Sequence, residues 1–258
     1  MFRILMLWLF VFSPTIFGEN DQLIGLNIAK EADLRDSGWV DMSVELVMTL
    51  RNTKGETNVR EMRLKSKEIF NDGDKTLMVF DTPHDVKGTG LLTYTHLVEE
   101  DDQWLYLPAL KRVKRIASKN KSGPFVGSEF AYEDLSSQEV TKYTYKYLRD
   151  EIINGIECFV TERYPVDQYS GYTRQVTWID KDHYRLQKVE YYDRKNKHLK
   201  TLTFKSYRLY ENRFWRAGSM TMTNHLSKKS TELKWNGYTF NRGINDQDFG
   251  KNALKRIR

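Results

Sequence analysis

The sequence predicts a mainly β protein whose strands form one antiparallel sheet that curls into a barrel or half-barrel. Most of the chain consists of short runs rich in Tyr, Thr, Val, Phe and Trp, which favour strands. Turn signals such as "NDGD" at 71–74 and "YSG" at 169–171 separate these runs. A parallel sheet needs helices between its strands, and no such pattern is present here. Because ten to twelve consecutive strands leave exposed edges, we expect the sheet to curl.

The N-terminal residues "MFRILMLWLFVFSPTIFGEN" predict a secretory signal peptide. Arg3 precedes an apolar run from Ile4 to Phe12, and Gly18 is a small residue where cleavage can occur. This run is shorter than the ~20 residues of a membrane-spanning helix. We expect a signal peptide over 1–18 and a single domain over 19–258, with an uncleaved N-terminal anchor as the alternative.

The elements follow in order along the chain. One helix is predicted over 21–36, because apolar residues recur near helical spacing, Asp21 can cap its start and Gly38 ends it. Short helical pieces are predicted over 129–138 and 245–254. The predicted strands are 41–52, 57–70, 75–82, 89–98, 103–108, 142–149, 157–165, 172–180, 184–193, 199–210, 213–224 and 230–241.

Composition excludes several classes of protein. Cys158 is the one cysteine, so no intramolecular disulfide forms, which argues against a small disulfide-stapled scaffold and is compatible with the bacterial periplasm. The net charge of +6 is modest and scattered, which favours anionic surfaces such as membrane headgroups over nucleic acid. The aromatic content of 13% either fills a core or lines a cavity for a hydrophobic guest.

Catalytic and metal-binding motifs do not emerge. The five histidines show no metal-binding spacing, and one cysteine cannot build a thiolate zinc site. "VGSEF" at 126–130 lacks the second glycine of a serine-nucleophile motif, and "EEDD" at 99–102 is typical of a hairpin turn. We therefore expect neither an enzyme nor a cofactor.

The stretch 101–135, "DDQWLYLPALKRVKRIASKNKSGPFVGSEFAYEDL", has two interpretations. In the first, a strand and a basic edge strand precede a mobile loop, and the charges discourage aggregation. In the second, the basic residues contact an anionic headgroup or partner, and the loop is a flap over an apolar cavity. The residues concerned are Arg112 and Arg115 for the contact, Phe125, Phe130 and Tyr132 for the cover, and Gly123 and Gly127 for the hinge.

The run "WLYLPALKRVKRI…KSGPFVGSEFAYEDL" resembles the signature of outer membrane lipoprotein-sorting proteins, the LolA-like superfamily. The match is close over 103–135, and the ending "KWNGYTFNRGINDQDF" supports it. The resemblance implies an incomplete, half-open antiparallel β-barrel of about eleven strands, with helices covering the concave face and a cavity that holds acyl chains. Motif residues Trp104 and Tyr106 join Phe125, Phe130 and Tyr132 as the expected ligand-binding set.

The resemblance further implies a monomeric periplasmic carrier of lipoproteins or other lipids. Its expected partners are an inner-membrane transporter of the resistance-nodulation-division type and an outer-membrane acceptor. The chain is longer than LolA and its motif belongs to a divergent branch, so both kinds of cargo stay open. The alternative is a periplasmic sensor or adaptor that binds a lipid or protein signal and regulates a membrane partner.

Overall fold

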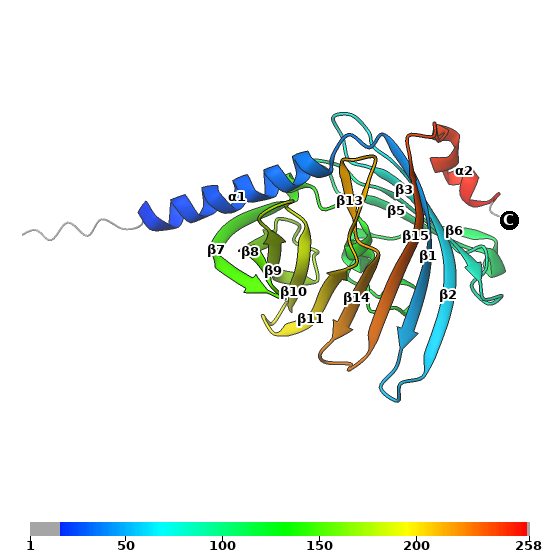
Figure 1. Ribbon diagram of the computed structural model, residues 1–258. Helices are drawn as coiled ribbons and strands as arrows, with labels where there is room; N and C mark the ends of the chain where they lie inside the picture. Colours follow the sequence, from blue (N-terminus) through cyan, green and yellow to red (C-terminus); the bar gives the residue numbers. More distant parts are fainter. Residues whose placement is uncertain (1–15, 257–258) are drawn as a thin grey trace, which may run out of the picture.

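The computed structural model describes residues 16–256 and shows a mainly β fold built on one large, strongly curved antiparallel sheet (Figure 1). The predicted signal peptide, 1–18, lies largely outside the described residues. Its last residues, from Ile16, belong to the first turn of helix α1 (Ile16–Asp36). No helix in residues 16–256 is both long and apolar enough to cross a membrane.

The strands largely follow the predicted ranges. They are β1 (Asp41–Arg51), β2 (Thr57–Lys67), β3 (Lys75–Thr82), β4 (Gly90–Tyr94), β5 (Asp102–Leu107), β6 (Arg112–Arg115), β7 (Tyr143–Ile153), β8 (Ile156–Pro165), β9 (Tyr172–Asp180), β10 (Leu186–Asp193), β11 (His198–Lys205), β12 (Arg208–Tyr210), β13 (Phe214–Arg216), β14 (Ser219–Asn224) and β15 (Ser230–Phe240). Strands predicted over 199–210 and 213–224 are each divided in two, because Ser206 adopts a positive φ and Gly218 packs against its carbonyl.

The helical pieces are few. Besides α1, the described residues contain α2 (Lys251–Leu254) and six short 3-10 turns. These turns are η1 (Pro108–Leu110), η2 (Ser118–Asn120), η3 (Phe125–Gly127), η4 (Tyr132–Leu135), η5 (Val140–Lys142) and η6 (Asp246–Phe249). The short helical pieces predicted over 245–254 are confirmed. The short helical piece predicted over 129–138 is confirmed as the single 3-10 turn η4, and the rest of that segment is not helical.

Thirteen strands form the sheet in the order β6-β5-β4-β3-β2-β1-β15-β14-β11-β10-β9-β8-β7, and β12 and β13 form a separate ribbon. The resemblance implies about eleven strands and the sequence predicts twelve strand ranges; the short edge strand β6 lies outside all twelve. Strands β1 and β15 pair, so the two ends of the chain meet in the middle of the sheet. The consecutive strands β6 and β7 lie at opposite edges, and the sheet stays open between them. The chain from 116 to 142 must therefore cross the concave side.

Strands β3 to β5 are apolar on both faces. Alternate residues Met78, Phe80, Leu91 and Leu105 belong to the core on the concave side. Their neighbours belong to a second cluster on the outer face, formed by Leu77, Val79, Leu92, Trp104, Tyr106, Phe249 and Leu254. Because side chains alternate along a strand, both faces of this part of the sheet need a cover. The C-terminal segment with α2 covers the outer face (Figure 1).

Candidate functional site

A cavity of about 740 Å³ lies between α1 and the concave face of the sheet. The helix contributes Ala29, Ala32, Asp33 and Asp36, which share one helical face at i, i+3, i+4 and i+7. The sheet and its loops contribute a largely apolar and aromatic wall. Its main members are Ile179, Leu186, Phe204, Tyr207, Trp215 and Met220.

Helix α1 approaches the sheet closely at Gly25. A Cβ atom at this position would lie 2.8 Å from the backbone nitrogen of Tyr147 in β7, so only glycine permits the contact. Ile28, one turn later, is buried against the protein. The buried face of α1 is thus narrow. The absence of a side chain at Gly25 allows the helix to pack closely on edge strand β7.

The C-terminal end of α1 is fixed by polar contacts. Arg35 donates to the carbonyl of Asp182 at 2.8 Å and lies over the ring of Tyr184 at 4.2 Å. Asp36 forms an ion pair with Arg216, which lines the cavity. These contacts hold the helix across one end of the curved sheet (Figure 1).

The cavity is not purely apolar. Arg163 donates to Gln175 at 2.7 Å, and Arg185 pairs with Asp180 at 2.7 Å, so both guanidinium groups are held by the sheet. Burial, with the nearby charge of Asp74, raises the pKa of Glu139 to about 7. This carboxyl group on the cavity wall is therefore protonated in part of the molecules at neutral pH.

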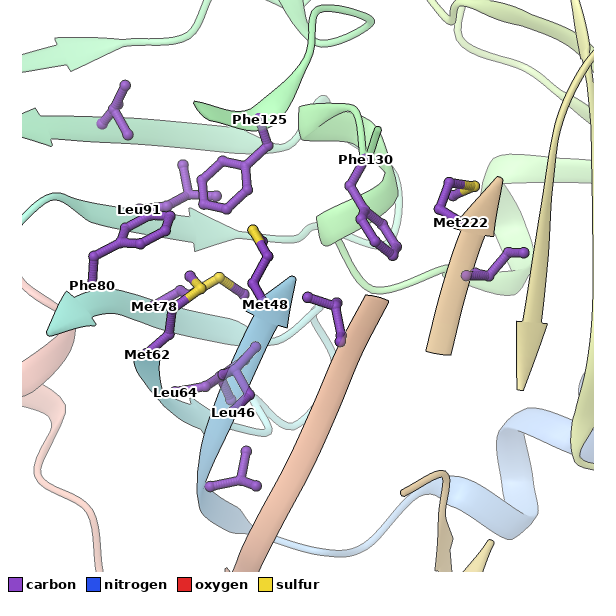
Figure 2. Close-up of a cluster of buried hydrophobic side chains, with 14 of the residues drawn as sticks. Leu46, Met48, Met62, Leu64, Met78, Phe80, Leu91, Phe125, Phe130 and Met222 are labelled. Atoms are coloured by element: carbon purple, nitrogen blue, oxygen red, sulfur yellow. The ribbon is translucent and has the colours of Figure 1, made fainter. Parts of the chain in front are cut away.

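The predicted flap fills the other half of the concave face. Phe125 has no exposed surface and Phe130 is 3% exposed. Figure 2 shows both rings pointing into the core, and the rings of Phe125 and Phe80 have centroids 5.6 Å apart. We call residues 116–135 the plug, because in this structure they fill the space that they were expected to cover.

Buried polar contacts anchor the plug. The ammonium of Lys200 in β11 lies 2.6 Å from the carboxylate of Asp134, and their side chains are 4% and 2% exposed. Tyr172 donates to the same carboxylate at 2.8 Å, and Lys200 also donates to the carbonyl of Glu129 at 3.1 Å. Arg60 donates to the carbonyl of Val126 at the tip of the plug.

The structure divides the predicted ligand-binding residues between two faces. Phe125, Phe130 and Tyr132 lie in or against the concave core, whereas Trp104 and Tyr106 belong to the outer cluster beneath the C-terminal segment. None of the five lines the 740 Å³ cavity. Their role in binding stays a prediction.

The remaining predicted residues lie on and near the edge of the sheet. Arg112 and Arg115 are exposed on edge strand β6, and Arg115 pairs with Asp102 at 2.6 Å. Gly127 has a φ of +76°, directly after Val126 with a φ of +45°. Two successive left-handed residues make the sharp turn at the plug tip, which explains a glycine at 127. Gly123 has no positive φ.

Sequence reasoning missed most of the cavity wall. Its residues come from α1, the 136–140 segment and strands that are far apart in the chain, so no single motif contains them. The signal that could have found them is the aromatic enrichment of the strands together with the helix predicted beside them. Within residues 16–256, no group of three or more His, Cys, Asp or Glu side chains could hold a metal ion.

Comparisons with known proteins identify relatives over most of the chain. A family model described as "uncharacterized protein" matches residues 72–256. A domain from Vibrio parahaemolyticus, named provisionally as an outer membrane lipoprotein-sorting protein domain, is 56% identical with a TM-score of 0.90; the match covers 91% of this chain and 100% of that one. Among curated proteins, none matches.

Two further solved structures share the architecture. A DUF1329 family protein from Desulfovibrio piger is 30% identical with a TM-score of 0.87, over 91% of this chain and 99% of that one. A LolA superfamily protein from Nitrosomonas europaea is 19% identical with a TM-score of 0.72, over 89% and 98%, and shows the fold alone. The chain therefore belongs to the family that includes the Vibrio domain and the DUF1329 protein, a divergent family with the LolA-superfamily fold.

Proposed function

We propose that this protein is a periplasmic carrier or binding protein that holds the acyl chains of a lipoprotein or another lipid beneath α1. The observation that carries the proposal is the 740 Å³ cavity with its apolar and aromatic wall. This volume lies within the ~300–1,000 Å³ that ligand sites usually occupy. The provisional name of the Vibrio domain, outer membrane lipoprotein sorting, supports the same reading.

Transfer of acyl chains from water into the cavity drives binding. Each buried methylene contributes about 0.8 kcal/mol, so the burial of an acyl chain supplies a driving force from which the cost of association is subtracted. A carrier must also release its cargo. Helix α1 is the moving part that we propose, since few buried apolar side chains and a small set of polar contacts hold it on the sheet.

The cellular setting completes the proposal. A signal peptide over 1–18, cleaved near Gly18, delivers the single domain to the periplasm as a monomer. An inner-membrane transporter of the resistance-nodulation-division type supplies or receives the cargo, and an outer-membrane acceptor is its counterpart.

The plug favours a second candidate function. Because its own side chains fill half of the concave face, the fold has less room for cargo than an empty half-barrel. A periplasmic sensor or adaptor that binds one lipid or protein signal, and stays bound to a membrane regulator, needs only a small site. Lasting association with one membrane partner supports this function, whereas exchange of cargo between donor and acceptor vesicles supports the carrier.

Filling the cavity tests the proposed site. Ala32→Trp places a large ring in the cavity, whereas Lys30→Trp places the same ring on the exposed side of α1. A fluorescent acyl probe should bind the wild type and Lys30→Trp equally, and Ala32→Trp at least tenfold more weakly. Equal binding by all three proteins would show that acyl chains do not enter the cavity.

A further inference from the structure

A second hollow lies beside the cavity. It has a volume of about 500 Å³ and runs between the β4–β5 loop (95–101) and the β8–β9 loop (166–171); we call it the rim groove. Ser136, Ser137 and Gln138 line both the rim groove and the cavity beneath α1. The two spaces therefore share this short segment as a wall and lie next to each other.

The rim groove is acidic and has apolar side chains at its edges. Val98 and Val166 lie at these edges. They are among the most exposed large apolar side chains of the described residues. The carboxylates that line the groove are Glu99, Glu100, Asp101, Glu133 and Asp167, against the two ammonium groups of Lys121 and Lys142. Asp101 neutralises Lys142. The groove therefore carries a negative excess that suits a cationic ligand.

Some of these carboxylates are already engaged by the protein. Glu133 accepts hydrogen bonds from Ser170 and from the backbone of Gly171, and Glu100 contacts the hydroxyl of Ser118. Among residues 16–256, the side chain of Glu99 has no hydrogen-bond or ion-pair partner. Glu99 and Glu100 are both exposed and are the groups that a ligand meets first.

Lys121 adds an independent feature. This residue is 6% exposed and lines the groove, and its ammonium has no acceptor among the described residues. Its backbone is fixed by hydrogen bonds to Ser118 and from Glu133 at 3.1 and 3.0 Å. The ammonium itself is not among the fully buried unpaired polar atoms, so it reaches the groove and can donate to a ligand oxygen there.

We infer that the rim groove binds a short, basic polypeptide segment of an acylated cargo whose acyl chains occupy the cavity beneath α1. Lys121 donates to a peptide carbonyl, and basic side chains of the segment meet Glu99, Glu100 and Asp167. The inference rests on the proposed function and narrows its cargo to lipoproteins with a basic segment next to the acylated residue. A lipid headgroup offers one cation, whereas these carboxylates lie on loops at both sides of the groove.

Two synthetic lipopeptides test this inference. Both carry dipalmitoyl-cysteine followed by serine, and their tails are four lysines or four glutamates. Each competes with the fluorescent acyl probe for the wild-type protein at low and high salt. The lysine tail should bind about five- to tenfold more tightly at low salt, because each exposed ion pair contributes modestly, and the difference should shrink at high salt.

Variants locate the effect. Glu99→Gln/Glu100→Gln should remove most of the preference, whereas Glu45→Gln/Glu157→Gln, which changes two carboxylates that line neither space, should keep it. Lys121→Met should weaken both lipopeptides, because it removes a contact to the peptide backbone, and should weaken the glutamate tail more, because the groove also loses a positive charge.

The outcomes separate the inference from the proposed function. Equal affinity for the two tails, with the acyl probe still displaced, overturns the peptide groove but leaves the carrier intact. Tighter binding of phosphatidylethanolamine than of the lysine lipopeptide, with the same dependence on Glu99 and Glu100, assigns the groove to a lipid headgroup and overturns the inference. Failure of the probe and both lipopeptides to bind overturns the proposed function itself.

Discussion

At the scale of single residues, the buried ion pair between Lys200 and Asp134 anchors the plug in the core. Both side chains are almost fully buried, and Tyr172 donates to the same carboxylate. Removing two charges from water is costly, and this cost is offset only while both partners and their hydrogen bonds remain. Loss of one partner therefore leaves an uncompensated charge inside the sheet.

We predict that Lys200→Met lowers the free energy of unfolding by about 3–5 kcal/mol. Urea unfolding followed by circular dichroism measures the change. The double variant Asp134→Asn/Lys200→Met should recover part of the loss, because it leaves no charge behind. A loss below ~1 kcal/mol for the single variant would mean that water reaches the pair.

Glu139 makes stability depend on pH. Burial and then the charge of Asp74 raise its pKa to about 7, with Asp33 and Asp101 adding to the effect and Lys142 opposing it. An unfolded glutamate titrates near ~4.3, so the folded protein binds this proton more tightly. The contribution of this proton to the stability of the fold is fully present below the pKa of the unfolded glutamate. It is lost as pH rises from there through about 7, the pKa of Glu139 in the folded protein.

Glu139→Gln should therefore stabilise the protein relative to wild type more at pH 8 than at pH 5. The midpoint of urea unfolding at the two pH values measures the difference. Glu157→Gln on the exposed surface serves as the control and should show no such pH dependence. The same shift for both variants would argue against a raised pKa at Glu139.

At the scale of elements, α1 and the plug divide the concave face between them. Helix α1 covers one half and leaves a cavity, whereas the plug fills the other half with its own aromatic side chains. The two covers differ in their contacts, since the plug contains fully buried rings and α1 depends on close approach at Gly25. We therefore expect α1 to open more readily than the plug.

Gly25→Ala should loosen α1, although alanine favours a helix by about 1 kcal/mol over glycine. The added Cβ would clash with the backbone of Tyr147 at 2.8 Å, so the helix must move away from β7. Hydrogen exchange of α1 and β7 should become faster. Asn27→Ala, at an exposed position of the same helix, should leave exchange in β7 unchanged.

Phe125→Ala should cost about 3–5 kcal/mol of stability, because it leaves a cavity where a fully buried ring packs against Phe80. Phe70→Ala removes a ring of the same size that is 92% exposed, and its effect should stay within ~0.5 kcal/mol. Urea unfolding compares the two variants. Similar small losses would indicate a plug that leaves the core easily.

At the scale of the whole molecule, the open sheet leaves two edges with different protection. Edge strand β7 lies beneath α1, whereas edge strand β6 carries exposed Arg112 and Arg115. Charge on β6 discourages pairing with another sheet and also offers a basic surface. We propose that this surface contacts anionic headgroups when cargo is exchanged.

Arg112→Glu/Arg115→Glu should weaken association with vesicles that contain anionic lipid, most strongly at low salt. Co-sedimentation with the vesicles measures the effect. A matched charge reversal at Arg51 and Lys54, in the hairpin between β1 and β2, controls for net charge. Equal loss of vesicle association in both variants would point to net charge alone. The charges on β6 would then serve only to discourage pairing with another sheet.

The strands, their approximate bounds and the antiparallel arrangement could be predicted from the sequence, because alternation and turn residues are local signals. For two strands, β9 at 172–180 and β3 at 75–82, the predicted bounds are confirmed to the residue. The sequence also predicts a short helical piece within 129–138, and the structure has one 3-10 turn there, Tyr132–Leu135. The burial of Phe130 beside that turn could not be predicted, because it depends on contacts with distant strands.

The sequence by itself determined that this protein is mainly β, has one long N-terminal helix and contains no intramolecular disulfide. Only the tertiary structure decided that β1 pairs with β15, that Trp104 and Leu105 face opposite covers, and that the cavity lies beneath α1 and not beneath the plug. The reason is physical: periodicity reports that a face is buried, whereas long-range packing alone determines what buries it and where space remains.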